Sequence, residues 1–163
     1  MSDAAGDLLT PHGVNDAMDR LTDDDVLTEI LAEWRRRLRS EPNAQAREDV
    51  RGQRERSLAR ALLDAAAAPE NSSQQSESLG KLAMIAALYG ADQPRERLDP
   101  GALCEELNHL REAVWHSLRQ GRLDAEATTE PILAFDRALS LAMHAAISGG
   151  YQCESEAREG ARG

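Results

Sequence analysis

The strongest apolar pattern in the chain follows an Asp99-Pro100 pair and stops before Gly121. An acid at the N-cap followed by proline favours the start of a helix, and glycine is common just past a helix end. Between these signals apolar side chains recur every three or four residues, at Leu103, Leu107, Leu110, Val114 and Leu118. This spacing predicts an amphipathic helix of about five turns over residues 100–120.

A second amphipathic helix is predicted upstream. Thr22 is a candidate N-cap, acidic residues follow it where the helix dipole favours anions, and Ser40-Glu41-Pro42 ends the pattern. Its apolar stripe consists of Leu27, Ile30, Leu31, Trp34 and Leu38. A shorter helix is expected from Thr10-Pro11 onward. Residues 43–57 are charged and lack apolar periodicity, so they form either a solvated helix or a mobile connector.

Helical periodicity returns in three other segments. The first contains Leu58, Leu62 and Leu63, and the second begins at Leu79 and ends at a Gly90 stop signal. The third follows a Thr128-Thr129-Pro131 start signal and ends at Gly149-Gly150. The stretch 69–78 is polar and of low complexity, which predicts a loop.

These segments predict an all-α protein, an antiparallel bundle of five to six helices. Aromatic residues make up only 3% of the chain, and such a composition is typical of close helix packing rather than of a β-sandwich. The 163 residues suffice for one domain with a core. We expect an N-terminal segment with a short helix at 1–21, the bundle at 22–150, and a flexible tail at 151–163.

Composition also limits the kinds of binding partner and the cellular compartment that we expect. The formal net charge is −10, opposite to that of most duplex-binding proteins, so no nucleic-acid partner is expected. No apolar run approaches the about 20 residues that span a bilayer, and the N-terminus lacks the features of a signal peptide. Cys104 and Cys153 form no disulfide framework. We therefore expect a cytoplasmic protein without a membrane partner.

One half-motif for metal chemistry lies on the central helix. Glu106 and His109 have the Glu-x-x-His spacing of the carboxylate-bridged di-iron bundles, which need the pair twice together with two further glutamates. No second pair exists, because Leu141 precedes His144 and Ala113 precedes His116 at the required position. The ligand set is incomplete, so we assign no di-iron site.

Other histidines offer a weaker alternative. His109 and His116 are seven residues apart on one helix face, and Cys104 and His144 are further candidates for ligating zinc or haem iron. Histidines in bundles more often serve as hydrogen-bonding residues. No G-x-S-x-G elbow and no glycine-rich phosphate loop occurs. We therefore assign no catalytic, cofactor-binding or metal-ligating residue, and we expect that the protein is not an enzyme.

Several charged and aromatic residues have a structural interpretation beside a functional one. The arginines at 35–37 and 39 can touch phosphates, but their place in a last helical turn favours a solvated end that complements the helix dipole. Glu106 and Arg111 are too offset for an i,i+4 pair, so each is expected to reach another helix or solvent. Trp34 and Trp115 are core anchors or, alternatively, an aromatic wall for a small ligand.

Four short motifs carry a resemblance to a known family. Glu106-Leu-Asn-His-Leu-Arg111 followed by Trp115 resembles the E-y-x-x-L-R signature of the N-terminal helical domain of RsbT co-antagonist (RsbRD-type) proteins, a domain that also precedes many bacterial histidine kinases. Ile30 to Trp34 is similar to the family's I-L-x-x-W helix. The other two motifs are Leu88-Tyr89-Gly90 with Arg95 or Arg97 and Leu98-Asp99, and Phe135 to Leu139 with Tyr151.

The resemblance implies a bacterial signal-input or interaction module, often dimeric, without catalysis of its own. Tyr89 stands where the family commonly has histidine, so the role of that histidine does not transfer. No STAS or kinase domain follows, which implies a single-domain protein or a sensor region alone. The leading hypothesis is a homodimeric regulatory bundle of stress-response or two-component signalling with a protein partner. The alternative is a bundle that holds haem, metal or a small apolar molecule near His109, His116 and Trp115.

Overall fold

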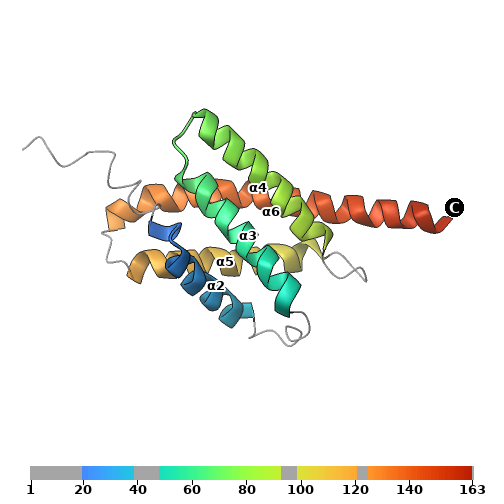
Figure 1. Ribbon diagram of the computed structural model, residues 1–163, viewed down its shortest axis with the longest axis horizontal. Coiled ribbons are helices and arrows are strands. Elements are labelled where there is room, and N and C mark those ends of the chain that lie inside the picture. The colour runs from blue at the N-terminus through green and yellow to red at the C-terminus, as the bar shows by residue number, and fades with distance from the viewer. Residues whose placement is uncertain (1–19, 39–47, 93–98, 121–124, 163) are drawn as a thin grey trace, which may run out of the picture.

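The computed structural model describes residues 20–38, 48–92, 99–120 and 125–162, without the side chains of 48–51 and 125–129. These ranges contain five helices and no strand: α2 (Asp24–Leu38), α3 (Glu48–Ala67), α4 (Ser73–Ala91), α5 (Pro100–Gln120) and α6 (Ala125–Arg162). Each helix runs against the one before it (Figure 1), so the predicted antiparallel all-α bundle is confirmed. The short helix expected from Thr10-Pro11, residues 43–47 and Gly121 lie outside the described residues.

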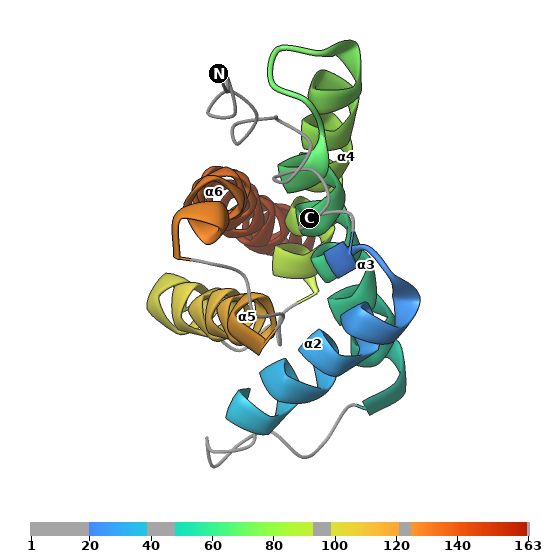
Figure 2. The ribbon, with the colours of Figure 1, turned by 90° about the vertical axis from the view of Figure 1, so that its left-hand side faces the viewer.

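The helices form two groups around one core. Seen along the bundle, α5 and α6 lie beside each other, while α4, α3 and α2 cover them on the other side (Figure 2). α6 contacts α3, α4 and α5, and α5 contacts α2 and α6. The predicted apolar stripes of α2 and α5 are fully buried, and Trp34 and Phe135 are the largest side chains that are wholly inside. Burial of these stripes is the main favourable contribution to folding.

The start of α5 is as the sequence predicts. Asp99 Oδ1 accepts hydrogen bonds from the backbone N–H of Gly101 at 2.9 Å and of Ala102 at 3.2 Å. These bonds satisfy two of the donors that the first turn of a helix leaves unpaired. The helix therefore begins at Pro100, and its regular geometry fixes the directions in which the side chains from Glu106 to Trp115 point.

Two predicted loop or connector segments are helical instead. α4 begins at Ser73, inside the predicted loop 69–78, because Ser72 Oγ caps the helix by accepting a bond from Gln75 N at 3.0 Å. Of the two alternatives for residues 43–57, the helix is correct for 48–57, which belong to α3. That helix is not wholly solvated, since Glu55 is buried and accepts a bond from Arg35 Nε at 3.0 Å.

The predicted end of the last helix is wrong, and residues 151–162, expected as a flexible tail, are helical. α6 continues through Gly149-Gly150 to Arg162. Gly149 lies against α4, where an added Cβ would come within 2.2 Å of Ala87 O, so this glycine permits close helix contact and does not end the helix. Gly90 plays the same part in α4, which ends one residue later at Ala91 with Asp92 as its C-cap.

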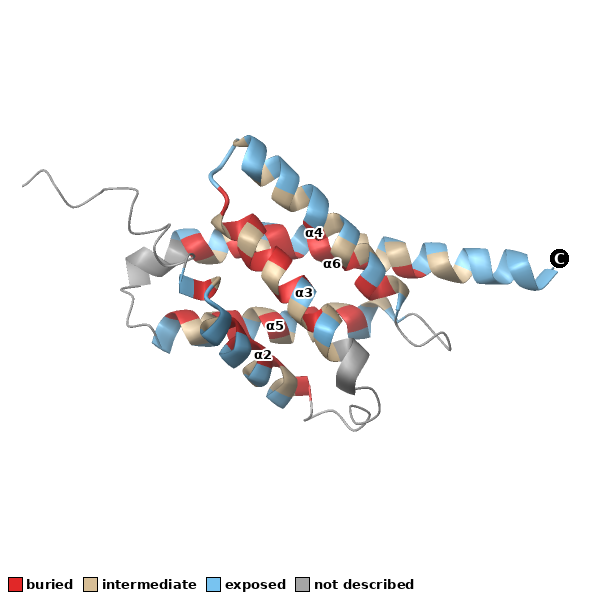
Figure 3. Ribbon diagram, viewed as in Figure 1, coloured by how far each residue is buried: buried red, intermediate tan, exposed pale blue. Residues whose placement is uncertain are grey.

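The last three turns of α6 extend beyond the bundle. In Figure 3 this part projects to the right and is largely exposed. Tyr151 and Gln152 are exposed, as are residues 155–162, while Cys153 and Glu154 are half-buried. The fold thus consists of a packed bundle with one helix leading away from it.

Candidate functional site

Most residues of the predicted signature lie on α5, which is in contact with α2 on one side and α6 on the other. Six of the seven residues belong to three clusters. The first contains Trp34, Tyr89 and Glu106, the second Arg111 and Trp115, and the third His109. His116 lies two turns further along α5 and lines a cavity. No single pocket brings all seven together in the described part of the chain.

The first cluster joins three helices through Glu106. Trp34 of α2 is fully buried and donates from Nε1 to the backbone oxygen of Glu106 at 2.9 Å. The hydroxyl of Tyr89, from α4, donates to the Glu106 carboxylate, and the Trp34 and Tyr89 rings lie 6.5 Å apart. Glu106 is half-buried, and the hydrogen bonds that it accepts from Trp34 and Tyr89 tie α5 to α2 and α4.

The second cluster joins α5 to α6. Arg111 forms a bidentate ion pair with Asp136, with Nε–Oδ1 at 2.6 Å and Nη2–Oδ2 at 2.7 Å. The Arg111 guanidinium also lies 4.2 Å from the centre of the Trp115 ring, and that of Arg119 lies 5.7 Å from it, both within the range of cation–π attraction. The hydrogen bonds that Arg111 donates to the Asp136 carboxylate raise the pKa of Arg111 above its usual range. Arg111 therefore reaches another helix, as the sequence spacing predicts.

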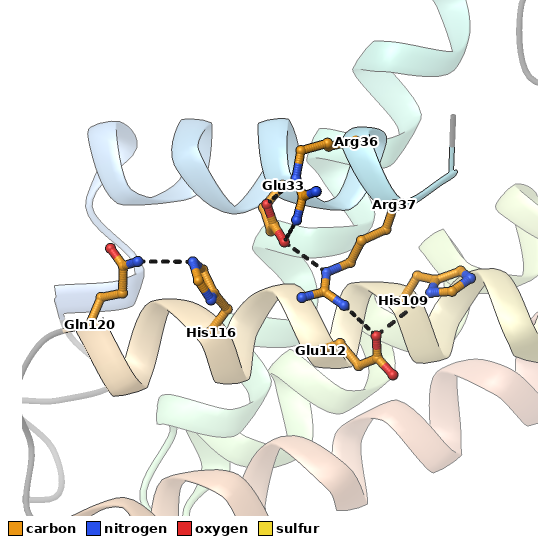
Figure 4. Close-up of polar contacts among 7 residues, drawn as sticks. All are labelled: Glu33, Arg36, Arg37, His109, Glu112, His116 and Gln120. Carbon is orange, nitrogen blue, oxygen red and sulfur yellow. Dashed lines mark hydrogen bonds and ion pairs between the residues drawn. The ribbon is translucent and has the colours of Figure 1, made fainter. Parts of the chain in front are cut away.

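The third cluster is a line of charged residues between α2 and α5 (Figure 4). Arg37 donates from Nε to Glu33 at 2.9 Å and from Nη1 to Glu112 of α5 at 2.5 Å. His109 Nδ1 lies 3.8 Å from the same Glu112 carboxylate. Arg35, Arg36 and Arg37 are each paired with a glutamate, which supports a structural role and leaves them less available to phosphate, while Arg39 lies outside the described residues.

Glu33 pairs with two arginines of this line. It accepts from Arg36 twice, at 2.8 Å and 2.6 Å, as well as from Arg37. The hydrogen bond from Arg36 is the main reason that the pKa of Glu33 falls from its ordinary 4.5 to about 2, with burial acting in the opposite direction. The carboxylate therefore remains ionised far into the acidic range.

A half-open cavity of about 610 Å³ lies beside this line, between α2 and α5. Ile30, Leu118 and Ala113 form apolar parts of its wall, and each is almost completely buried. His116 also lines it and is hydrogen-bonded to Gln120, with 3.0 Å between Nε2 and Nε2. Among the predicted signature residues, His116 is the one that faces this cavity.

The residues proposed as alternative metal ligands are not assembled. Figure 4 shows His109 and His116 about two turns apart on α5, with different neighbours. His144 is exposed, and Cys104 and Cys153 are half-buried free thiols. In the part of the chain that the structure describes, no three side chains of His, Cys, Asp or Glu converge so that they could hold one metal ion.

Sequence reasoning missed the partners of the signature residues. Asp136 pairs with Arg111, and Glu33 and Glu112 pair with Arg37, but none of the three stands out in a single sequence. The expected shared site for Trp115 and the histidines does not form, since Trp115 lies beside Arg111 and does not line the cavity. Trp115 Nε1 is buried and has no hydrogen-bond partner within the described ranges.

Comparisons with known proteins identify no relative of this chain. No family model matches the chain, and neither a curated protein nor a solved structure matches it. In the described ranges, no helix is both long enough and apolar enough to cross a bilayer.

Proposed function

We propose that this bundle is a non-catalytic signal-input and interaction module of bacterial signal transduction, which acts through protein–protein contacts as a homodimer. The observation that carries the proposal is α6, a helix that is packed in the bundle over its first part and projects from it over Tyr151–Arg162. When one continuous helix is packed at one end and projects at the other, a shift of the packed end also moves the projecting end and can be passed to a partner that contacts it.

The signature residues support this proposal through their positions. Arg111 and Asp136 link α5 to α6, and Glu106 links α5 to α2 and α4. The bidentate ion pair therefore joins α5 to the packed part of the helix that projects. The resemblance of these motifs to the RsbRD-type domain points to the same role.

The homodimer has a candidate surface on α4. Met84 is 62% exposed and Leu88 is 60% exposed, and the two residues lie one turn apart on the same helix. Exposed large apolar side chains on one helical face favour association when a second surface covers them. We place the contact between copies on this face of α4.

The experiment is light scattering of the purified chain over a range of concentrations. The proposal expects a mass twice the 17.8 kDa of one chain. The double variant Met84→Glu/Leu88→Glu should be a monomer with unchanged helicity, because two buried charges per copy would oppose the contact. The matched control is Leu133→Glu, at an exposed leucine of α6, which should remain a dimer.

Two results would contradict the proposal. A wild-type chain that is monomeric at every concentration has no homodimer. A double variant that stays dimeric while Leu133→Glu dissociates would move the interface from α4 to the N-terminal part of α6.

A further inference from the structure

The cavity between α2 and α5 has the size and the lining of a small-molecule site. Its volume of about 610 Å³ lies inside the about 300–1,000 Å³ that is typical of ligand pockets. Leu21, Ile30, Ala113 and Leu118 line it and are each at most 3% exposed, so their side chains give the cavity an apolar floor. An apolar ligand body placed on this floor would lose contact with water on the side that faces the protein.

Hydrogen-bonding side chains occupy one face of α5 along this cavity. His116, Ser117 and Gln120 all line it, at positions that lie three or four residues apart or adjacent on the helix. His116 and Gln120 are already bonded to each other, which orients the imidazole and the amide. Together they offer a hydroxyl, an amide and a ring nitrogen, each able to donate or accept.

The charges at the cavity cancel. Arg36 and Glu33 line it but bond to each other twice, so each charge has an opposite charge beside it, and this pairing lowers the pKa of Glu33. Arg20 and Glu29 add one further charge of each sign. Transfer of a net charge into such a site is costly unless an uncompensated opposite charge awaits it. The lining therefore favours a ligand without net charge.

We propose that the α2–α5 cavity binds a small, net-neutral, mostly aromatic or aliphatic molecule that carries one or two hydrogen-bonding groups. The apolar body lies on the floor of Ile30, Ala113 and Leu118, and the polar group faces Ser117 and Gln120. This site is separate from the α4 face of the proposed homodimer, so the ligand site and the homodimer contact are tested by different experiments.

The test uses three probes of nearly equal shape with the full chain: para-phenylphenol, which is neutral, para-phenylbenzoate, an anion, and para-phenylbenzylammonium, a cation. Binding is followed by backbone amide NMR and by calorimetry. The expected result is saturable binding of the neutral probe, with shifts confined to α2 and residues 113–120. The two charged probes should bind at least about tenfold more weakly, because desolvation of their charge is not compensated.

Two variants locate the binding. Ser117→Phe places a ring inside the cavity and should weaken the neutral probe at least about tenfold, whereas Ser148→Phe, at an exposed serine of α6, should not change it. If Ser117→Phe does not reach wild-type helicity, Gln120→Ala replaces it. Gln120 is exposed at the end of α5, and loss of its amide should weaken binding about fivefold.

Three outcomes would overturn the proposal. No saturable shift with any probe would show that the cavity binds no such ligand. Tighter binding of either charged probe would show that Arg20 or Glu29 selects a charge. Equal loss of binding in Ser117→Phe and Ser148→Phe would place the site elsewhere.

Discussion

Gly90 of α4 lies directly against the main chain of Ala146 in α6. A Cβ atom built on Gly90 would come within 1.8 Å of Ala146 O, and one built on Gly149 within 2.2 Å of Ala87 O. Each helix therefore presents a glycine to an alanine of the other. This reciprocal arrangement explains how α4 and α6 form the most extensive contact in the bundle.

The first prediction is that Gly90→Ala destabilises the protein. Alanine normally stabilises a helix interior by about 1 kcal/mol relative to glycine, yet here the added methyl group must displace the α6 main chain. We expect a net loss of about 1–3 kcal/mol in the free energy of unfolding, as is typical of an overpacked core. Urea denaturation followed by circular dichroism measures this loss.

Gly80→Ala is the matched control in the same helix. Gly80 is exposed and nothing lies within 4 Å of its added Cβ, so the substitution should raise stability by about 0.5–1 kcal/mol. Opposite signs at the two glycines are the expected result. If Gly90→Ala also stabilises the protein, α4 and α6 do not approach each other as closely as described.

This contact explains why Gly149-Gly150 does not end α6. Glycine is common just beyond helix ends, so both Gly90 and this pair predict a helix end. α4 does end one residue after Gly90, whereas α6 continues to Arg162. A signal for the alternative was present: α4 contains Ala83, Ala86, Ala87 and Gly90, and α6 contains Ala142, Ala145, Ala146 and Gly149, with identical spacing. Matched rows of small residues on two helices favour a close approach of those helices to each other.

The second prediction concerns the ion pair between α5 and α6. Arg111→Lys should destabilise the protein even though the charge is kept, because lysine cannot form both bonds to Asp136 or stack on Trp115 as a planar group. The pair is about one-third exposed, which screens it, so we expect a cost of about 1 kcal/mol. Urea denaturation is again the measurement.

A double-mutant cycle with Asp136→Asn separates the pair from its surroundings. The coupling between Arg111→Lys and Asp136→Asn should be about 0.5–1 kcal/mol, since each change removes the same interaction. Additive effects would show that Arg111 acts through Trp115 alone. Arg158→Lys, on the projecting end of α6, should be neutral and serves as the control.

The candidate site was predictable only in part. The motifs identify Trp34, Glu106 and Arg111, and the expectation that Glu106 and Arg111 each reach another helix or solvent is met, since both bond to another helix. Their partners lie 17 and 25 positions away along the chain, on other helices. Periodicity reports which face of a helix is buried, but not which residue of another helix lies opposite. Asp136 and Tyr89 could be assigned as partners only from the packed structure.

The third prediction is a pH dependence that arises from Glu33. Its pKa in the folded protein is about 2, below its ordinary 4.5, because Arg36 and Arg37 donate to the carboxylate. A carboxylate whose pKa is lowered by folding contributes stability that is complete above its ordinary pKa and is lost as the pH falls toward the folded value. The contribution of Glu33 should therefore be full above about pH 5 and disappear progressively between there and about pH 2.

Glu33→Gln tests this prediction against Glu29→Gln. Glutamine cannot ionise, so the free energy of unfolding of Glu33→Gln should lie below that of the wild type at pH 7, and the two should converge as the pH falls from 5 to about 2. Glu29 is exposed on the same helix, and Glu29→Gln is the matched control for the loss of one carboxylate. Parallel curves for Glu33→Gln and the wild type would show that Arg36 and Arg37 do not hold this carboxylate in solution. The α2–α5 cavity would then contain an uncommitted negative charge, and a cationic ligand would become the better candidate for it.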